Sequence, residues 1–312
     1  MVVLPEPINH TVTAIYEAYE RTARHGDGRG VAMSDAANEC ERAIWYKLRW
    51  AVPGEKTDGR KERIFETGRI EEDRLLDNLE SAGLIVERVD PATGKQFSVS
   101  LARGWLRGKL DGRATGVIEA PKTVHVVECK SHNEKSFKEL SKKKLRDGKP
   151  DHFAQCQLYT HAEQITRCLY IAVNKNTDEL YIERIEYDAG FALTLEAKIE
   201  RIVRTDRAPS RLHDDPTSKA AFACGRCRAY AQCHEAAFSR MNCRTCIHAS
   251  FEDGAEVRCV RLDKILSYKE QQDGCDQHRY LPDLVPGEQV DVAGDVIVYR
   301  MNDGSEWRDG VK

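Results

Sequence analysis

LRGKLDGRATGVIEAPKTVHVVECK, residues 106–130, is the stretch that decides the fold. Short apolar and alternating runs at 106–120 and 123–130 predict two strands, joined by a turn near Pro121. Side chains alternate across a strand, so the Glu and the Lys of the final ECK project from one face of the second strand. The two strands therefore predict the centre of a sheet that carries charged groups on one side.

The segments around this stretch predict a mixed architecture. Apolar periodicity predicts helices at 11–25, 34–50, 66–83, 151–165 and 188–205. The second of these helices would be capped by Ser34, and the third would end at Gly83. Alternating runs predict further strands at 84–90 and 97–101 and a hairpin at 168–187. This order indicates an α/β (α+β) core with a mixed sheet flanked by helices, rather than repeated βαβ units.

Composition narrows the class of protein. The chain has 312 residues, of which 41% are apolar and 32% charged, and a formal net charge of −3. It contains no run of about 20 apolar residues, so no membrane helix is expected. The N-terminus, MVVLPEPINHTV, has neither a basic region nor a long apolar run. We therefore expect no secretory leader and a cytoplasmic location.

The central candidates for chemistry are Asp111, Glu128 and Lys130. If the two strands pair, two carboxylates and one ammonium converge at a strand end. Carboxylates are the ligands that Mg²⁺ and Mn²⁺ prefer, and a neighbouring lysine can orient water and offset negative charge on a phosphate. A salt bridge between strands is the simpler interpretation, because so short a pattern often arises by chance.

Further candidates lie on either side. Glu71 and Glu72, on the predicted helix 66–83, could each add a metal ligand. Gln155 and Tyr159 stand four residues apart and therefore share one helical face. Residues 131–150 hold seven Lys or Arg against three Asp or Glu, which would suit a phosphate backbone or form an ordinary solvated loop. The candidate DNA-binding residues there are Lys142, Lys143, Lys144 and Arg146.

In their order these motifs, GRIEE, LDG, ECK and QCQLY, resemble the RecB-like branch of the PD-(D/E)XK nucleases. The resemblance covers roughly residues 30–235 and implies a restriction-endonuclease-like fold. It implies Asp111 and Glu128 as ligands of the divalent metal, with the Cys129 carbonyl as a third. Lys130 would be the catalytic lysine, and Gln155 with Tyr159 would position the substrate. Many members carry His where this chain has Glu72, so Glu71 and Glu72 compete for that role.

Cysteine usage adds two metal-binding patterns, since seven of the eleven cysteines lie in residues 224–275. The first pattern, C-x2-C-x5-C, supplies three thiolates, and Cys40 is the obvious fourth. Four thiolates hold either zinc or an iron–sulfur cluster. With Cys40 in its C-x-R-x3-Y context, this set resembles the iron–sulfur nucleases close to the CRISPR-associated and AddB-type exonucleases. The resemblance implies a [4Fe–4S] cluster on Cys40, Cys224, Cys227 and Cys233.

The second pattern, C-x2-C-x12-C-x15-C, predicts a zinc knuckle. Its ligands would be Cys243, Cys246, Cys259 and Cys275. His278 could replace one of the last two cysteines or hydrogen-bond to a ligand. A segment this short cannot build a real core, so a metal must contribute folding energy. His234 and His248 are interpreted as surface residues, and Cys156 and Cys168 as buried thiols.

Together these features predict a Mg²⁺- or Mn²⁺-dependent DNA exonuclease of recombination, repair or phage DNA processing. Its partners would be DNA, single-stranded or with a free end, and a helicase or recombinase. A catalytically silent DNA-binding adaptor and a site-specific endonuclease are the alternatives. The expected organisation is a nuclease domain at 1–238, a zinc-ribbon-like knuckle at 239–286 and a terminal β-hairpin at 287–312.

Overall fold

The structure, a computed structural model, describes residues 9–23, 26–54 and 56–310. The expectation of no secretory leader concerns residues 1–8, which lie outside this part. Within the described ranges, no helix combines the length and the apolar character that crossing a membrane requires.

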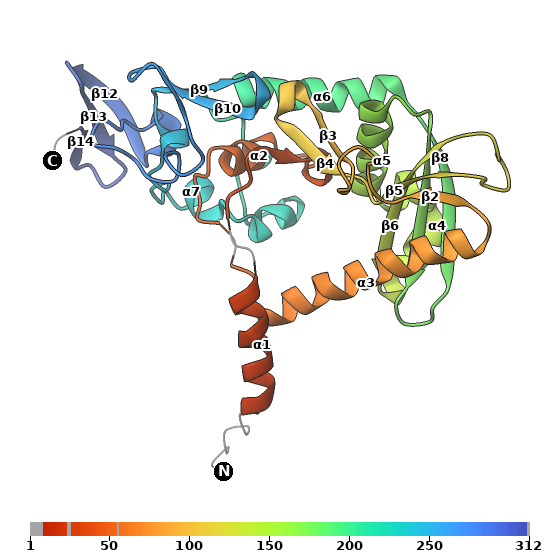
Figure 1. Ribbon diagram of the computed structural model, residues 1–312. Helices are drawn as coiled ribbons and strands as arrows, with labels where there is room; N and C mark the ends of the chain where they lie inside the picture. The colour runs from red at the N-terminus through yellow and green to blue at the C-terminus, as the bar shows by residue number, and fades with distance from the viewer. Residues whose placement is uncertain (1–8, 24–25, 55, 311–312) are drawn as a thin grey trace, which may run out of the picture.

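A five-stranded mixed sheet has the strand order β2-β5-β6-β7-β8 (Figure 1). β6 and β7 run parallel, and every other neighbouring pair is antiparallel. β6 carries the ECK motif and is almost wholly buried, with only Lys130 and Ser131 partly exposed. The five strands are β2 (Ile85–Glu87), β5 (Gly112–Thr115), β6 (His125–His132), β7 (Arg167–Asn174) and β8 (Leu180–Glu186).

Helices cover both faces of this sheet. The leucines of α3 (Gly59–Ser81) pack in one buried cluster with Val127 and Cys129 of β6. Val126, which alternates with them, belongs to the larger cluster on the opposite face. That face is covered by α4 (Glu134–Gly148), α5 (Pro150–Glu163) and α6 (Ala189–Arg204). Glu128 and Lys130 share the side of Val126, so they face α5.

The predicted strand 106–120 is wrong as a single element. Residues 106–109 form β4 in a separate sheet of order β1-β4-β3, whereas β5 belongs to the central sheet. Between them the chain passes through buried Leu110 and through Asp111. The strand therefore breaks where the candidate acid stands. The separate sheet consists of β1 (Val31–Ala32), β4 (Leu106–Lys109) and β3 (Ser98–Leu101).

Two predicted helices differ in their bounds. Within 34–50 only α2 (Glu41–Leu48) is α-helical, and Cys40 rather than Ser34 is its N-cap. α3 begins at Gly59, earlier than predicted, because the Asp58 carboxylate caps it by accepting a hydrogen bond from the Lys61 amide at 2.7 Å. Its end agrees with the prediction, since Gly83 follows at a φ of +91°.

Most of the lysine-rich segment 131–150 is helical, whereas one of the two interpretations of its sequence was an ordinary solvated loop. Asn133 caps α4, and its side chain accepts a hydrogen bond from the Ser136 amide at 2.9 Å. Phe137, Leu140 and Leu145 bury the inner face of α4, so its basic residues are left on the outside.

The chain beyond α6 continues through α7 (Tyr230–His234) into two small sheets. The first has the order β11-β10-β9 and the second β12-β13-β14, so the predicted terminal hairpin is a three-stranded sheet. A turn does lie at Asn302–Gly304, as predicted. The strands are β9 (Ala249–Glu252), β10 (Glu256–Cys259), β11 (Lys264–Leu266), β12 (Gly287–Ala293), β13 (Val296–Met301) and β14 (Glu306–Asp309). At the other end of the chain, α1 (His10–Thr22) projects toward the bottom of the view in Figure 1.

The C-terminal part packs directly on the N-terminal part. One hydrophobic cluster runs from Ile44 and Trp45 of α2 to Val257 of β10 and Tyr299 of β13. This cluster crosses both predicted domain boundaries. The three-part division remains a prediction about how the chain is organised.

Candidate active site and cysteine cavities

Strand register brings Asp111 beside Glu128. β5 pairs with β6 so that Gly112 lies opposite Val127, and one step along the antiparallel ladder Asp111 is level with Glu128. Asp111 is further fixed because its Oδ2 accepts a hydrogen bond from the Cys129 amide at 2.7 Å. Burial raises the pKa of Asp111, whereas the Lys130 ammonium and the hydrogen bond from the Cys129 amide lower it.

Glu128 is the most deeply buried of the site carboxylates, at 1% exposed. Its Oε1 accepts a hydrogen bond from Lys130 Nζ, but its Oε2 is buried and has no hydrogen-bond partner. Burial, with the added charge of Asp111, raises the pKa of Glu128 to about 8 against the pull of Lys130. Burial lowers the pKa of Lys130, but Glu128 and Asp111 outweigh it and hold the lysine charged.

Glu72 joins the same cluster from α3. Burial raises its pKa to about 7, with the Asp111 carboxylate as the next cause, and Lys130 opposes the rise. Glu71, its competitor, instead pairs with Arg74 at 3.4 Å on the same helix. Glu72 is thus close enough to Asp111, Glu128 and Lys130 for their charges to influence one another.

Gln155 and Tyr159 face the site from α5. Gln155 Nε2 donates a hydrogen bond to Tyr159 Oη at 3.1 Å. Tyr159 is buried against β4, where a Cβ on Gly108 would lie 2.5 Å from its ring. Glycine at 108 therefore makes room for the tyrosine. Burial and then the Glu128 charge raise the pKa of Tyr159, so its hydroxyl stays protonated.

Sequence reasoning missed a hydrogen-bonded chain next to Lys130. Ser136 Oγ lies 3.0 Å from His132 Nδ1, and His132 Nε2 lies 2.9 Å from Tyr170 Oη. The same hydroxyl lies 2.9 Å from His152 Nδ1. Burial lowers the pKa of both histidines to about 4. The next cause is the Lys149 charge for His132 and the Lys130 charge for His152. The signal was present, because His132 follows Lys130 by two residues on one strand.

The predicted DNA-binding residues lie exposed on α4. Lys143 pairs with Glu139 at 2.9 Å, and Arg146 lies 3.7 Å from Asp188. Lys144 stands over the Tyr181 ring at 5.7 Å. The charge is therefore partly compensated within the chain.

The first cysteine set lines one cavity of about 330 Å³. Cys40 reaches it from the start of α2, while Cys224, Cys227 and Cys233 reach it from the segment around α7. Burial raises the pKa of Cys224, and the nearby Cys40 and Cys233 raise it further. His234 also lines this cavity and is half-buried, rather than lying at the open surface.

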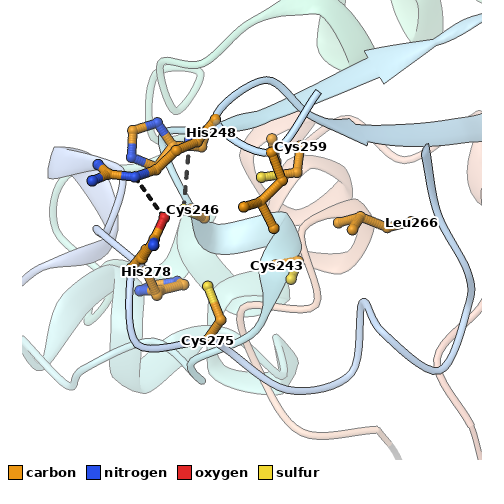
Figure 2. Close-up of a pocket in the computed structure, with 11 residues that line it drawn as sticks. Cys243, Cys246, His248, Cys259, Leu266, Cys275 and His278 are labelled. Carbon is orange, nitrogen blue, oxygen red and sulfur yellow. Dashed lines mark hydrogen bonds between the residues drawn. The ribbon is translucent and has the colours of Figure 1, made fainter. Parts of the chain in front are cut away.

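The second cysteine set lines a much smaller cavity, of about 20 Å³ (Figure 2). Burial raises the pKa of Cys243 to about 11, and the other three thiols of the set raise it further. His248, interpreted from sequence as a surface residue, lines the cavity and is half-buried. The chemically relevant side chains around the cavity are Cys243, Cys246, Cys259, Cys275, His248 and His278.

As the side chains stand, no group of three or more His, Cys, Asp or Glu within the described ranges is arranged to hold a metal ion. In the acidic cluster the Lys130 ammonium lies against Glu128 Oε1. Binding an ion there requires that side chain to turn aside. The unpartnered Glu128 Oε2 and the thiol-lined cavities nevertheless have the donor chemistry that such ions take.

No family model matches the sequence, and no curated protein does. Three solved structures show a distant structural similarity. LHK-Exo, an alkaline exonuclease from Laribacter hongkongensis, is 14% identical, with a TM-score of 0.38 over 60% of this chain and 90% of that chain. LHK-Exo in complex with dAMP is 12% identical, with a TM-score of 0.39 over 61% of this chain and 90% of that chain. SSO0001 is 12% identical, with a TM-score of 0.40 over 70% of this chain and 94% of that chain.

Proposed function

We propose that this protein is a divalent-metal-dependent deoxyribonuclease, and specifically an exonuclease. The observation that carries the proposal is the state of Glu128, a buried carboxylate with one unpartnered oxygen beside two other carboxylates. Leaving such groups unpaired in a protein interior is costly, and a cation relieves the cost. A structural salt bridge needs one carboxylate for one lysine, whereas here both Glu128 and Asp111 act on Lys130.

Asp111, Glu128 and Glu72 would hold the ion, with the Cys129 carbonyl as a further oxygen. Mg²⁺ or Mn²⁺ bound there would polarise the phosphodiester and lower the pKa of a bound water. Lys130, which Glu128 and Asp111 keep charged, would supply a positive charge at the place where negative charge grows on the phosphate.

Gln155 and Tyr159 supply neutral hydrogen-bonding groups on the α5 side of the same cluster. Their mutual hydrogen bond fixes both side chains, so they are ordered before substrate arrives. The exposed lysines of α4 then offer the DNA backbone a positively charged surface.

The first cysteine cavity would hold a [4Fe–4S] cluster on Cys40, Cys224, Cys227 and Cys233. Its volume of about 330 Å³ far exceeds the roughly 10–15 Å³ needed for one water-sized occupant, so a polynuclear group suits it better than a single ion. Because Cys40 directly precedes α2, the cluster would tie that helix to the segment after α6.

The test is digestion of end-labelled linear DNA with added Mg²⁺ or Mn²⁺. Lys130→Ala should fold and keep its iron but lose at least about a hundredfold in rate, as loss of a transition-state charge contact does. Lys122→Ala, an exposed lysine on the turn before β6, is the matched control and should cut normally. Digestion by Lys130→Ala at the wild-type rate would contradict the proposal.

Closed single-stranded circles separate the remaining outcomes. An exonuclease leaves them intact, whereas a site-specific endonuclease opens them. A wild-type protein that binds linear DNA yet cuts neither substrate would be a silent adaptor.

A further inference from the structure

We propose that the small cavity beside β10 is a zinc site formed by Cys243, Cys246, Cys259 and His278, with Cys275 outside it. The inference is independent of the proposed nuclease activity. It selects one ligand set from five donors that the sequence spacing leaves in competition.

The hydrogen bonds of His278 determine which of its nitrogens is free. Nε2 lies 3.1 Å from the Asn242 carbonyl, which can only accept, so Nε2 carries the proton and donates it. Nδ1 is then a bare lone pair. It is buried, it has no hydrogen-bond partner, and the whole residue is only 4% exposed.

This arrangement is the one that a zinc-bound histidine needs. A ligating imidazole typically donates its other N–H to a carboxylate or backbone carbonyl, which fixes the tautomer and the ring. An unpartnered acceptor buried in a cavity lined by thiols is otherwise destabilising.

Cys275 and His248 are weaker candidates. Cys275 lines the same cavity but is exposed, and a fifth donor exceeds the four of a closed tetrahedral site. His248 Nε2 is also buried without a hydrogen-bond partner, but the His248 ring points away from the cysteine sulfurs (Figure 2). The volume of about 20 Å³ suits one small ion.

The site would hold a structural anchor in place. Arg244 lies between two of the proposed ligands, and its guanidinium is 3.9 Å from the centre of the Trp50 ring. It donates hydrogen bonds to the carbonyls of Leu48 and Arg29 at 3.0 Å and to Gln271 Oε1 at 2.9 Å. Zinc on Cys243 and Cys246 would fix the loop that carries this buried arginine into the core next to α2.

The test is the zinc content of purified full-length protein, measured by mass spectrometry beside its iron. Relative to wild type, His278→Ala should lose one equivalent of zinc and unfold at a lower temperature. His278→Cys should regain the zinc, because a thiolate can replace the imidazole, whereas a purely structural ring would not be rescued. Cys275→Ser and the control His248→Ala should keep the wild-type zinc content.

Full zinc in His278→Ala, or loss of one equivalent in Cys275→Ser, would overturn the ligand set. Cys275 is exposed, so its serine variant should fold and decide the matter even if His278→Ala cannot be purified. A wild-type protein with no zinc at all would overturn the site itself.

Discussion

Replacing Glu128 by Gln removes a carboxylate that the fold holds in an unfavourable place. Its pKa is raised from 4.5 to about 8, chiefly by burial. A carboxyl group with a raised pKa favours the folded state only while it is protonated. Its contribution is therefore complete below about pH 4.5 and is lost as the pH rises through about 8.

The size of the effect follows from that change in pKa. Relative to low pH, burying Glu128 costs the metal-free protein on the order of 1 kcal/mol of stability at pH 5.5 and on the order of 4 kcal/mol at pH 7.5, because the carboxyl group ionises in the unfolded state but stays protonated in the folded state. Glu128→Gln does not titrate. The difference in unfolding free energy between the two proteins should thus change by about 2 kcal/mol or more over this range, in favour of the variant.

The assay is thermal unfolding of both proteins at pH 5.5 and 7.5, first without added divalent ions and then with Mn²⁺. The gap between their midpoints should change by roughly 5 °C between the two pH values. Mn²⁺ should stabilise the wild type and have less effect on Glu128→Gln, because the ion binds the ionised carboxylate. A gap that is independent of pH would refute the reasoning.

Three further changes test other parts of the structure. His152→Ala should slow DNA cleavage about tenfold or more, because this ring lies beside Lys130, whereas the exposed control His10→Ala should not; equal rates would exclude His152 from the site. Arg244→Met should lower the thermal midpoint by at least about 5 °C, since it leaves buried carbonyls unpaired, while exposed Arg300→Met should change it little. Cys40→Ser should lose the iron and the brown colour of protein purified without air, and Cys275→Ser should keep both; a colourless wild-type protein that carries zinc instead would contradict the cluster.

Much of the central sheet could be predicted from local patterns. The run VHVVECK is apolar and β-branched enough to indicate a buried strand, and alternation alone places Glu128 and Lys130 on one face. The apolar periodicity of residues 188–205 also predicted α6, which the structure shows at Ala189–Arg204. These features are decided by residues close together in the chain.

Features that depend on distant contacts were not predictable in this way. Nothing local shows that the strand must break at Asp111, since the break exists because β4 and β5 pair with different sheets. The helix α4 was overlooked because its many lysines hid Phe137 and Leu140 on its inner face. Likewise, the partners of His278 come from residues more than thirty positions away, so spacing could not choose between it and Cys275.

The central claim is that Asp111, Glu128 and Glu72 bind a divalent ion. The most direct test is titration with Mn²⁺ followed by electron paramagnetic resonance, which counts free Mn²⁺ and does not depend on DNA or turnover. Wild type should bind Mn²⁺, and Asp111→Asn should bind it at least tenfold more weakly, while Asp77→Asn, an exposed control on α3, should match the wild type. Equal Mn²⁺ affinity in wild type and Asp111→Asn would contradict the account.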